Sequence, residues 1–171
     1  MPLPEPPAVP ASYEWRDAVH VLPGGLDLHL GGRVERVEVA YRLAGAQGAP
    51  VVAVLGGISA GRNVFSLQPD ATGWWEEAIG PGRALDTDRF QVLGMDFLGG
   101  SHRTTGPGEG DVFPSVSAFD QARLIVALMD HLGVERLQAS LGASYGGMVT
   151  LALAQAHPER LRHAVVLSAA H

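Results

Sequence analysis

The sequence contains no cysteine, which excludes disulfide bonds, thiolate metal sites and a cysteine nucleophile. It also has no apolar run that approaches the roughly 20 residues of a membrane-spanning helix, and no basic region followed by an apolar one at its N-terminus. We therefore expect a cytoplasmic protein that does not bind membranes. A formal net charge of −6 argues against nonspecific binding to nucleic acid.

The chain does have enough apolar sequence for a folded core. Apolar residues make up 46% of the 171 residues and charged residues 18%, which indicates one globular domain or part of one. Residues 1–12 hold five prolines and predict an extended or disordered arm. Residues 13–171 are expected to form the folded part.

Short apolar segments predict the strands of a sheet. Residues 34–43 alternate apolar and polar side chains, which is typical of an edge strand with one outward face. Apolar runs of the kind found in buried strands lie at 51–55, 90–95, 137–141 and 164–168. Residues 13–30 show no clear pattern apart from a predicted turn at 23–25.

The clearest helix is predicted at 116–132, where apolar side chains recur at intervals of three and four residues. Ser117 and Asp120 form a predicted capping box at its start, and Gly133 ends it. Further helices are expected at 74–79 and 145–157. Strands and helices alternate between residues 90 and 168, which predicts an α/β fold with a doubly wound, mostly parallel sheet.

A G-x-S-x-G motif, residues 142–146, lies where the predicted strand 137–141 meets the predicted helix 145–157. A serine in a tight strand-to-helix turn has a strained backbone, and glycines two residues to either side relieve the crowding. This pattern is the nucleophile elbow of the α/β-hydrolase fold, so Ser144 is expected to be the nucleophile. The alternative is a structural serine in a glycine-rich turn, because 22 residues are glycine.

Acyl transfer through such a serine requires two N–H donors for the developing oxyanion. Tyr145, which follows the serine, is expected to supply the first. Gly57, in the glycine-rich loop after the strand 51–55, is expected to supply the second, with its neighbour Ile58 as the other candidate. The alternative is that these glycines only turn the chain. The loop does not match a phosphate-binding motif.

The histidines show no metal-ligand spacing, and we expect no metal site. His131 and His157 lie near predicted helix ends, where the helix dipole favours a cation. His171 follows the last predicted strand, but a free chain end is a poor place for a general base. Asp96 and Asp120 are interpreted as hydrogen-bonding residues of a loop and a helix cap. The histidines without a partner at ligand spacing are His20, His29 and His102.

Longer segments carry a family resemblance. They are residues 73–76, 79–90, 96–100 and 104–107, the elbow at 142–148, and His157-Pro158-Glu159-Arg160. Together they resemble the homoserine O-acyltransferase family of the α/β-hydrolase superfamily, over roughly residues 24–171. The segments between 73 and 107 are more specific than the elbow, because generic hydrolases lack them.

The resemblance implies transfer of an acetyl or succinyl group from acyl-CoA to the hydroxyl of L-homoserine, through an acyl-serine, early in methionine synthesis. Acyl-CoA is then a co-substrate, no cofactor is bound, and the full-length form is expected to be a homodimer. The family's acetyltransferases have His-Ala-Leu-Thr-Gly where this chain has residues 55–59, and an asparagine where it has Asp96. Ile58 and Ser59 are therefore expected at the acceptor pocket.

Two alternatives to homoserine remain open. One is a serine O-acyltransferase of the same family, and the other is an esterase that uses water as acceptor. The small residues Gly57, Ser59 and Ala60 favour the longer homoserine over serine.

Members of this family carry a helical lid, and their triad aspartate and histidine follow the serine in the second half of the chain. In this sequence one helix and one strand take up the residues after Ser144. We therefore expect the 171-residue chain to be the N-terminal part of an α/β-hydrolase domain, truncated after the strand that follows the elbow helix. By itself it is expected to be inactive, and to aggregate, dimerise or require a complementing second half.

Overall fold

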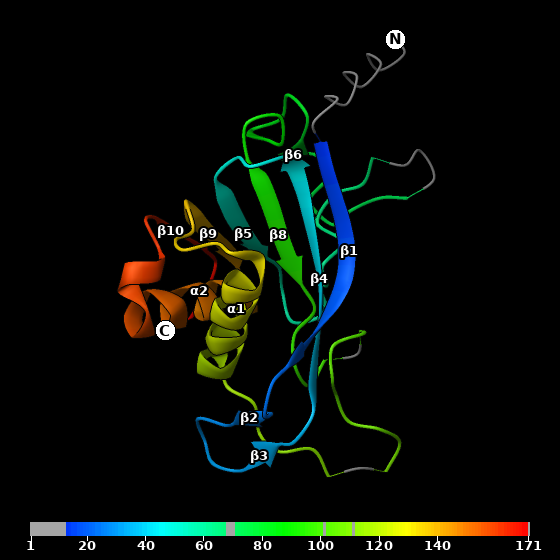
Figure 1. Ribbon diagram of the computed structural model, residues 1–171, viewed down its shortest axis with the longest axis vertical. Helices are drawn as coiled ribbons and strands as arrows, with labels where there is room; N and C mark the ends of the chain where they lie inside the picture. The colour runs from blue at the N-terminus through cyan, green and yellow to red at the C-terminus, as the bar shows by residue number, and fades with distance from the viewer. Residues whose placement is uncertain (1–12, 68–70, 101, 111, 171) are drawn as a thin grey trace.

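The computed structural model describes residues 13–67, 71–100, 102–110 and 112–170 (Figure 1). The predicted arm at 1–12 and His171 lie outside the described residues. A six-stranded sheet has the order β1-β4-β8-β5-β9-β10. Its strands are β1 (Tyr13–Leu22), β4 (Val37–Ala46), β8 (Gln91–Met95), β5 (Val51–Leu55), β9 (Ala139–Ala143) and β10 (Ala164–Leu167).

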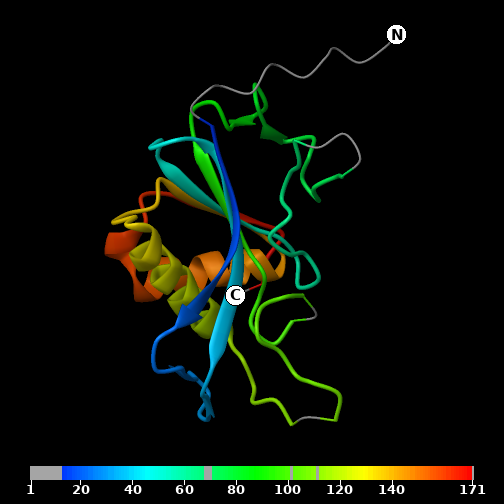
Figure 2. The same ribbon diagram turned by 45° about the vertical axis from the view of Figure 1, so that its right-hand side comes forward.

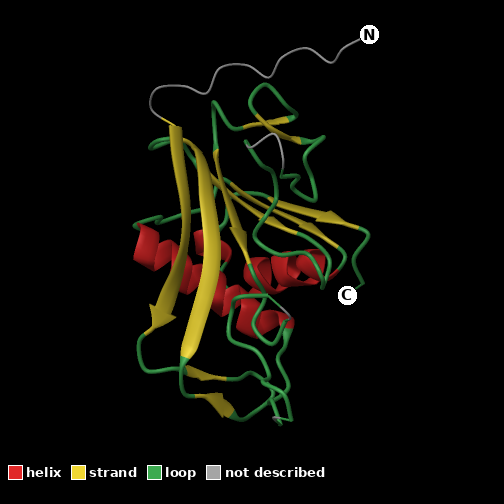
Figure 3. Cartoon of the chain, turned by 90° about the vertical axis from the view of Figure 1, so that its right-hand side faces the viewer, coloured by secondary structure: helices red, strands yellow, loops and turns green. Residues whose placement is uncertain are grey.

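The sheet is mostly parallel, which confirms the predicted fold class. Strands β8, β5, β9 and β10 pair in parallel, whereas β4 runs antiparallel to both β8 and β1. Two small two-stranded sheets lie at opposite ends of the molecule (Figures 1 and 3). They consist of β2 (Leu26–Asp27) with β3 (Arg33–Val34), and β6 (Ile79–Gly80) with β7 (Leu85–Asp86).

The prediction of an edge strand at 34–43 was wrong in its bounds and in its position. The strand there is β4, Val37–Ala46, and it lies inside the sheet between β1 and β8. The edge is β1, Tyr13–Leu22, from the region that showed no clear pattern. Charged side chains interrupt the alternation of apolar and polar residues along β1. One of them, Asp17, lies opposite Arg42 of β4 and forms an ion pair with it at 2.5 Å.

The two faces of the sheet are covered differently. Alternate residues of β5, such as Ala53 and Leu55, belong to the same apolar core as α1 (Ala118–Leu132) and α2 (Tyr145–Ala156). The intervening residues Val52 and Val54 belong to a second core with Phe65 and Ile79. The segment after β5 therefore covers the face opposite the helices (Figures 1 and 2).

The predicted helix at 74–79 is not formed. Residues 74–78 make turns, in which the N–H groups of Ala78 and Ile79 both donate to the carbonyl of Trp75, and the chain then enters β6. Gly80 has a φ of 150°, which a helix does not allow, so any helix would have to end before it. The remaining segment is too short to offset the cost of nucleating a helix.

The predicted capping box of α1 is confirmed. Asp120 N–H donates to Ser117 Oγ at 3.4 Å, and Ser117 N–H donates to the Asp120 carboxylate at 2.8 Å. Gly133 ends the helix in the left-handed conformation with φ of 70°, also as predicted. Within the described part of the chain, neither helix is long and apolar enough to cross a bilayer.

Helix α2 packs directly on the end of β5 because its first turn contains Gly146. The Gly146 N–H donates to the carbonyl of Gly56 at 2.9 Å, and a Cβ at Gly146 would collide with the carbonyl of Leu55. Gly146→Ala is expected to lower the free energy of unfolding by about 1–3 kcal/mol in urea denaturation. Gly57→Ala is the matched control, since a Cβ there has no atom within 4 Å. Equal losses in the two variants would contradict this explanation.

His20 of β1 stacks on His131 of α1, with ring centroids 4.2 Å apart. Burial and repulsion from His131 lower the pKa of His20 below its ordinary value of 6.5. The unfolded chain therefore binds this proton more tightly, so stability is full above pH 6.5 and falls as the pH drops below it. His20→Gln should remove this part of the pH dependence of thermal unfolding, whereas His157→Gln should not. An unchanged pH dependence in His20→Gln would refute the interpretation.

Candidate active site

Ser144 stands at the turn between β9 and α2 in a strained conformation. Its φ of 53° and ψ of −119° are unusual for a residue with a side chain. Among the described residues, Ser168 is the only other non-glycine residue with positive φ. The Ser144 side chain is exposed, and its hydroxyl has no hydrogen bond to any described residue. This is the geometry that the predicted nucleophile elbow requires.

The glycines at 142, 146 and 147 sit where no side chain fits. A Cβ at Gly142 would collide with the carbonyl of Gly146, and one at Gly147 would lie 2.6 Å from the Cβ of Ala169. The first turn of α2 therefore lies in direct contact with β9 and with the chain after β10. These contacts agree with the crowding that the G-x-S-x-G spacing predicts.

The elbow adjoins the loop that follows β5, which we call the donor loop (residues 56–62). The bond from Gly146 N–H to the Gly56 carbonyl joins them at 2.9 Å. In the donor loop, Ala60 N–H donates to the Gly57 carbonyl at 2.9 Å and closes a tight turn. Neither the Gly57 N–H nor the Tyr145 N–H has an acceptor among the described residues. Both groups are therefore available to an oxyanion, and their assignment to an oxyanion hole stays a prediction.

Ile58 and Ser59, the two predicted substrate contacts, border different hollows. The Ile58 side chain is 71% exposed and lines a cavity of about 310 Å³ together with Phe97 and Tyr145. Ser59 lines a separate cavity of about 380 Å³ with Arg62. The structure therefore does not bring the two side chains into one pocket, and their contact with substrate stays a prediction.

Tyr145 is held by neighbours in the first cavity. Its ring packs edge-on against Phe97, with centroids 5.0 Å apart. Burial raises the pKa of the Tyr145 hydroxyl, and a hydrogen bond to Gln121 opposes this in part. Gln121 is itself buried and exchanges two hydrogen bonds with the backbone of Leu98. Tyr145, which follows Ser144, thus has a fixed side chain and, we infer, a fixed backbone N–H.

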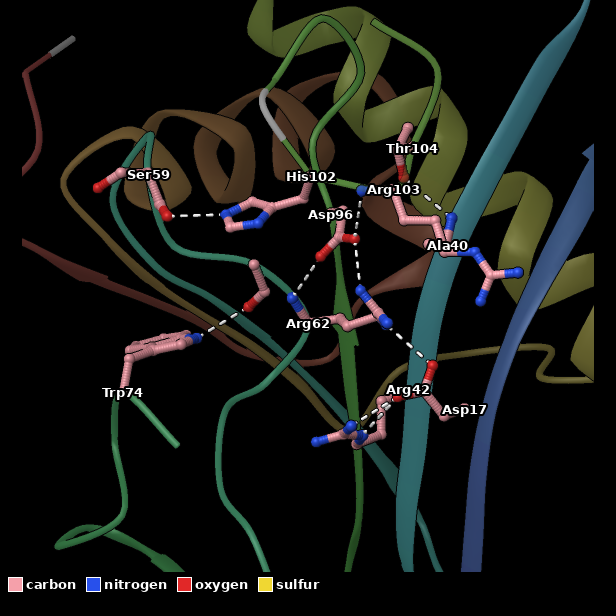
Figure 4. A network of polar contacts seen from close by, with 11 residues as sticks. Asp17, Ala40, Arg42, Ser59, Arg62, Trp74, Asp96, His102, Arg103 and Thr104 are labelled. Atoms are coloured by element: carbon pink, nitrogen blue, oxygen red, sulfur yellow. Dashed lines mark hydrogen bonds and ion pairs between the residues drawn. The ribbon is translucent and has the colours of Figure 1, made fainter. Parts of the chain in front are cut away.

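Asp96 lies at the end of β8 and accepts hydrogen bonds from loop backbone, as predicted. Its carboxylate accepts from the N–H of Arg62 at 2.7 Å and from the N–H of Arg103 at 3.1 Å (Figure 4). It also forms an ion pair with the Arg62 guanidinium at 2.7 Å. Arg62 was missed in the sequence, because its partners Asp17 and Asp96 lie 45 and 34 residues away and no local spacing connects them.

The charge of Arg62 is maintained despite partial burial. Burial alone would lower the pKa of Arg62, but hydrogen bonds and attraction from Asp17 and Asp96 outweigh it, so the pKa is raised. Burial would likewise raise the pKa of Asp17, but hydrogen bonds from Arg42 and Arg62 reverse the shift and lower it. Asp17 and Arg62 are therefore both charged at neutral pH, and Arg62 ends the donor loop.

The described residues supply no hydrogen-bonded base for Ser144. Asp120 belongs to the helix cap, as predicted, and also accepts from the backbone N–H of His29 at 2.8 Å. His102, which was assigned no role, contacts the carbonyl of Ser59 at 2.9 Å. No three His, Asp or Glu side chains converge on a common point within the described ranges.

Comparison with known proteins agrees with this geometry. Residues 50–171 match the family model of the alpha/beta hydrolase fold. The homoserine O-succinyltransferase of Comamonas testosteroni is 36% identical in an alignment of 160 positions that covers 85% of this chain and 39% of that protein. The homoserine O-acetyltransferase of Clavibacter michiganensis is 36% identical over 94% of this chain and 46% of its own length. The serine O-succinyltransferase of Emericella nidulans is 36% identical over 82% of this chain and 30% of that protein.

Solved structures share the fold. Homoserine O-acetyltransferase from Staphylococcus aureus superposes with a TM-score of 0.82 at 23% identity, over 91% of this chain and 47% of that one. Esterase E22 superposes with a TM-score of 0.75 at 25% identity, over 86% of this chain and 46% of that one. The chain thus spans less than half the length of these relatives. It belongs to the α/β-hydrolase superfamily and, within it, to the homoserine O-acyltransferase family, of which it matches the N-terminal part.

Proposed function

We propose that an enzyme of the relatives' full length that carries this chain transfers an acyl group from acyl-CoA to L-homoserine, with Ser144 as the covalent nucleophile. The observation that carries the proposal is the strained, exposed Ser144 at an elbow whose glycines allow no side chain. The acetyl- and succinyltransferases that act on homoserine, at 36% identity, support the substrate class.

In this proposal the reaction has two half-reactions. Ser144 Oγ attacks the thioester carbonyl, the N–H groups of Gly57 and Tyr145 stabilise the oxyanion, and CoA leaves with a proton. The homoserine hydroxyl then attacks the acyl-serine and regenerates Ser144. A base must accept the proton of each attacking hydroxyl, and we place it in the part of the relatives that this chain does not span.

The proposed acceptor is L-homoserine in place of serine or water. A relative that acts on serine and an esterase of the same fold show that related proteins use other acceptors. Two observations favour homoserine. A relative that aligns with most of this chain is a homoserine O-succinyltransferase. There is also open space at Gly57, where a Cβ would meet no atom within 4 Å. One additional methylene in an apolar pocket changes binding by only about 1–3 kcal/mol.

The test is to give labelled acyl-CoA to an enzyme of full length and to measure transfer to homoserine, serine and water. We expect kcat/KM for homoserine to exceed that for serine, and Ser144→Ala to abolish transfer, since loss of a nucleophile costs several orders of magnitude. The Ala variant should keep the fold and bind acyl-CoA. A tenfold preference for serine, transfer to water alone, or more than a few per cent activity in Ser144→Ala would each refute a stated part of the proposal.

Residues 1–171 expressed alone are expected to be inactive, because the Ser144 hydroxyl has no hydrogen-bonded base among the described residues. Self-association is also expected, because β10 is an edge strand on which Val165 and Leu167 are 38% and 41% exposed. Gel filtration and an assay of CoA release measure both properties. A monomer with homoserine acyltransferase activity would contradict this expectation and make His171 the base to examine.

A further inference from the structure

The donor loop is tied to the rest of the molecule by three side chains that lie outside it (Figure 4). His102 Nε2 lies 2.9 Å from the carbonyl oxygen of Ser59. Trp74 Nε1 donates to the carbonyl of Gly61 at 2.8 Å, and Asp96 accepts from the N–H of Arg62 at 2.7 Å. All three ties are made to the backbone of the loop, so they determine its path whatever its side chains are.

Asp96 anchors the end of the loop. Its side chain is 1% exposed, and its two oxygens accept from the Arg62 N–H, the Arg62 guanidinium and the Arg103 N–H. Gly61 allows this close approach, since a Cβ there would lie 2.6 Å from Asp96 Oδ1 and 3.1 Å from His102 Cδ2. At Gly61 the loop thus packs against both a buried carboxylate and an imidazole.

His102 holds the tip of the loop. A carbonyl oxygen only accepts, so His102 Nε2 carries the hydrogen and donates it to Ser59. The imidazole lies on an exposed part of the segment after β8, so it is not a core residue. Its bond fixes one side of the tight turn that starts at Gly57, and the bond from Gly146 to Gly56 fixes the other side next to Ser144.

We propose that His102 and Asp96 are positioning residues that hold the donor loop so that the Gly57 N–H faces the oxyanion formed at Ser144. Neither residue touches the reacting atoms. A donor contributes to catalysis only when it is fixed before the reaction, and a displacement of about 1 Å can cost a factor of a hundred. The inference rests on the proposed nucleophilic role of Ser144.

The test compares His102→Ala with His102→Gln in an enzyme of full length. Glutamine keeps an N–H that can donate to the Ser59 carbonyl, whereas alanine removes it. Single-turnover release of CoA should show acylation of Ser144 slowed roughly tenfold in His102→Ala and restored to within about threefold of wild type in His102→Gln. Binding of acyl-CoA and the pH dependence of acylation should be unchanged. His157→Ala, at the far end of α2, is the matched control.

Hydrogen exchange of the peptide that covers residues 56–62 gives a second readout that does not depend on activity. We expect faster exchange in His102→Ala and near-wild-type exchange in His102→Gln and His157→Ala. Asp96→Asn should also loosen this peptide, because an amide N–H₂ cannot accept from the Arg62 guanidinium. Asp130→Asn on α1, which loses an ion pair with Arg160 far from the donor loop in sequence, should not.

The outcomes separate this inference from the proposed function. Wild-type acylation rates and exchange in His102→Ala would overturn the positioning role. Equally slow acylation in the Ala and Gln variants would also overturn it. Glutamine keeps the N–H donor but cannot titrate, so this result would indicate that His102 acts as an acid or base. If the wild-type enzyme acylates Ser144 but transfers the acyl group only to water, the homoserine proposal fails. The acylation rates of the His102 variants still test the positioning role. If Ser144 is never acylated, the proposed function fails, and the exchange data alone decide whether His102 ties the loop.

Discussion

The close contact between the first turn of α2 and the end of β5 determines the rest of the site. Gly146 N–H donates to the carbonyl of Gly56 at 2.9 Å, and there is no room for a side chain between them. This contact brings the elbow and the donor loop together, so it places the proposed nucleophile and the candidate N–H donor at once. The strain at Ser144, of order 1–3 kcal/mol, persists because the strands and helix on both sides are packed in the core.

A second constraint is electrostatic and acts on the end of the donor loop. A partly buried arginine between two carboxylates adds little net stability, because desolvation offsets most of the attraction. Geometry explains its presence better, since Arg62 contacts Asp96 through both its backbone N–H and its guanidinium. Loss of Asp96 would remove both of these contacts and leave the guanidinium paired with Asp17 alone, so the end of the loop would no longer be fixed. The charges therefore specify one loop conformation.

Local patterns predicted the elements whose determinants lie close together in sequence. The capping box of Ser117 and Asp120 predicted where α1 starts, and the glycines around Ser144 predicted the elbow. Strand β1 was missed because charged residues such as Asp17 interrupt its apolar pattern. The partner of Asp17 is Arg42 on the adjacent strand β4, which the sequence of β1 alone does not indicate. The helix expected at 74–79 failed because Ile79 pairs with Leu85 instead of extending a single turn.

The same distinction separates the predicted from the missed parts of the site. Ser144, Gly57 and Tyr145 follow from a motif and from the order of strand and loop, whereas His102 has its partner 43 residues away. That partner is a backbone carbonyl, which every residue has, so no residue type in the sequence marks it. A search for histidines at ligand or triad spacing considers side-chain partners only, so it does not find a histidine that binds a backbone carbonyl. For this chain the proposed nucleophile can be predicted from a local motif, but the rigidity of its surroundings comes from contacts that only the folded sheet creates.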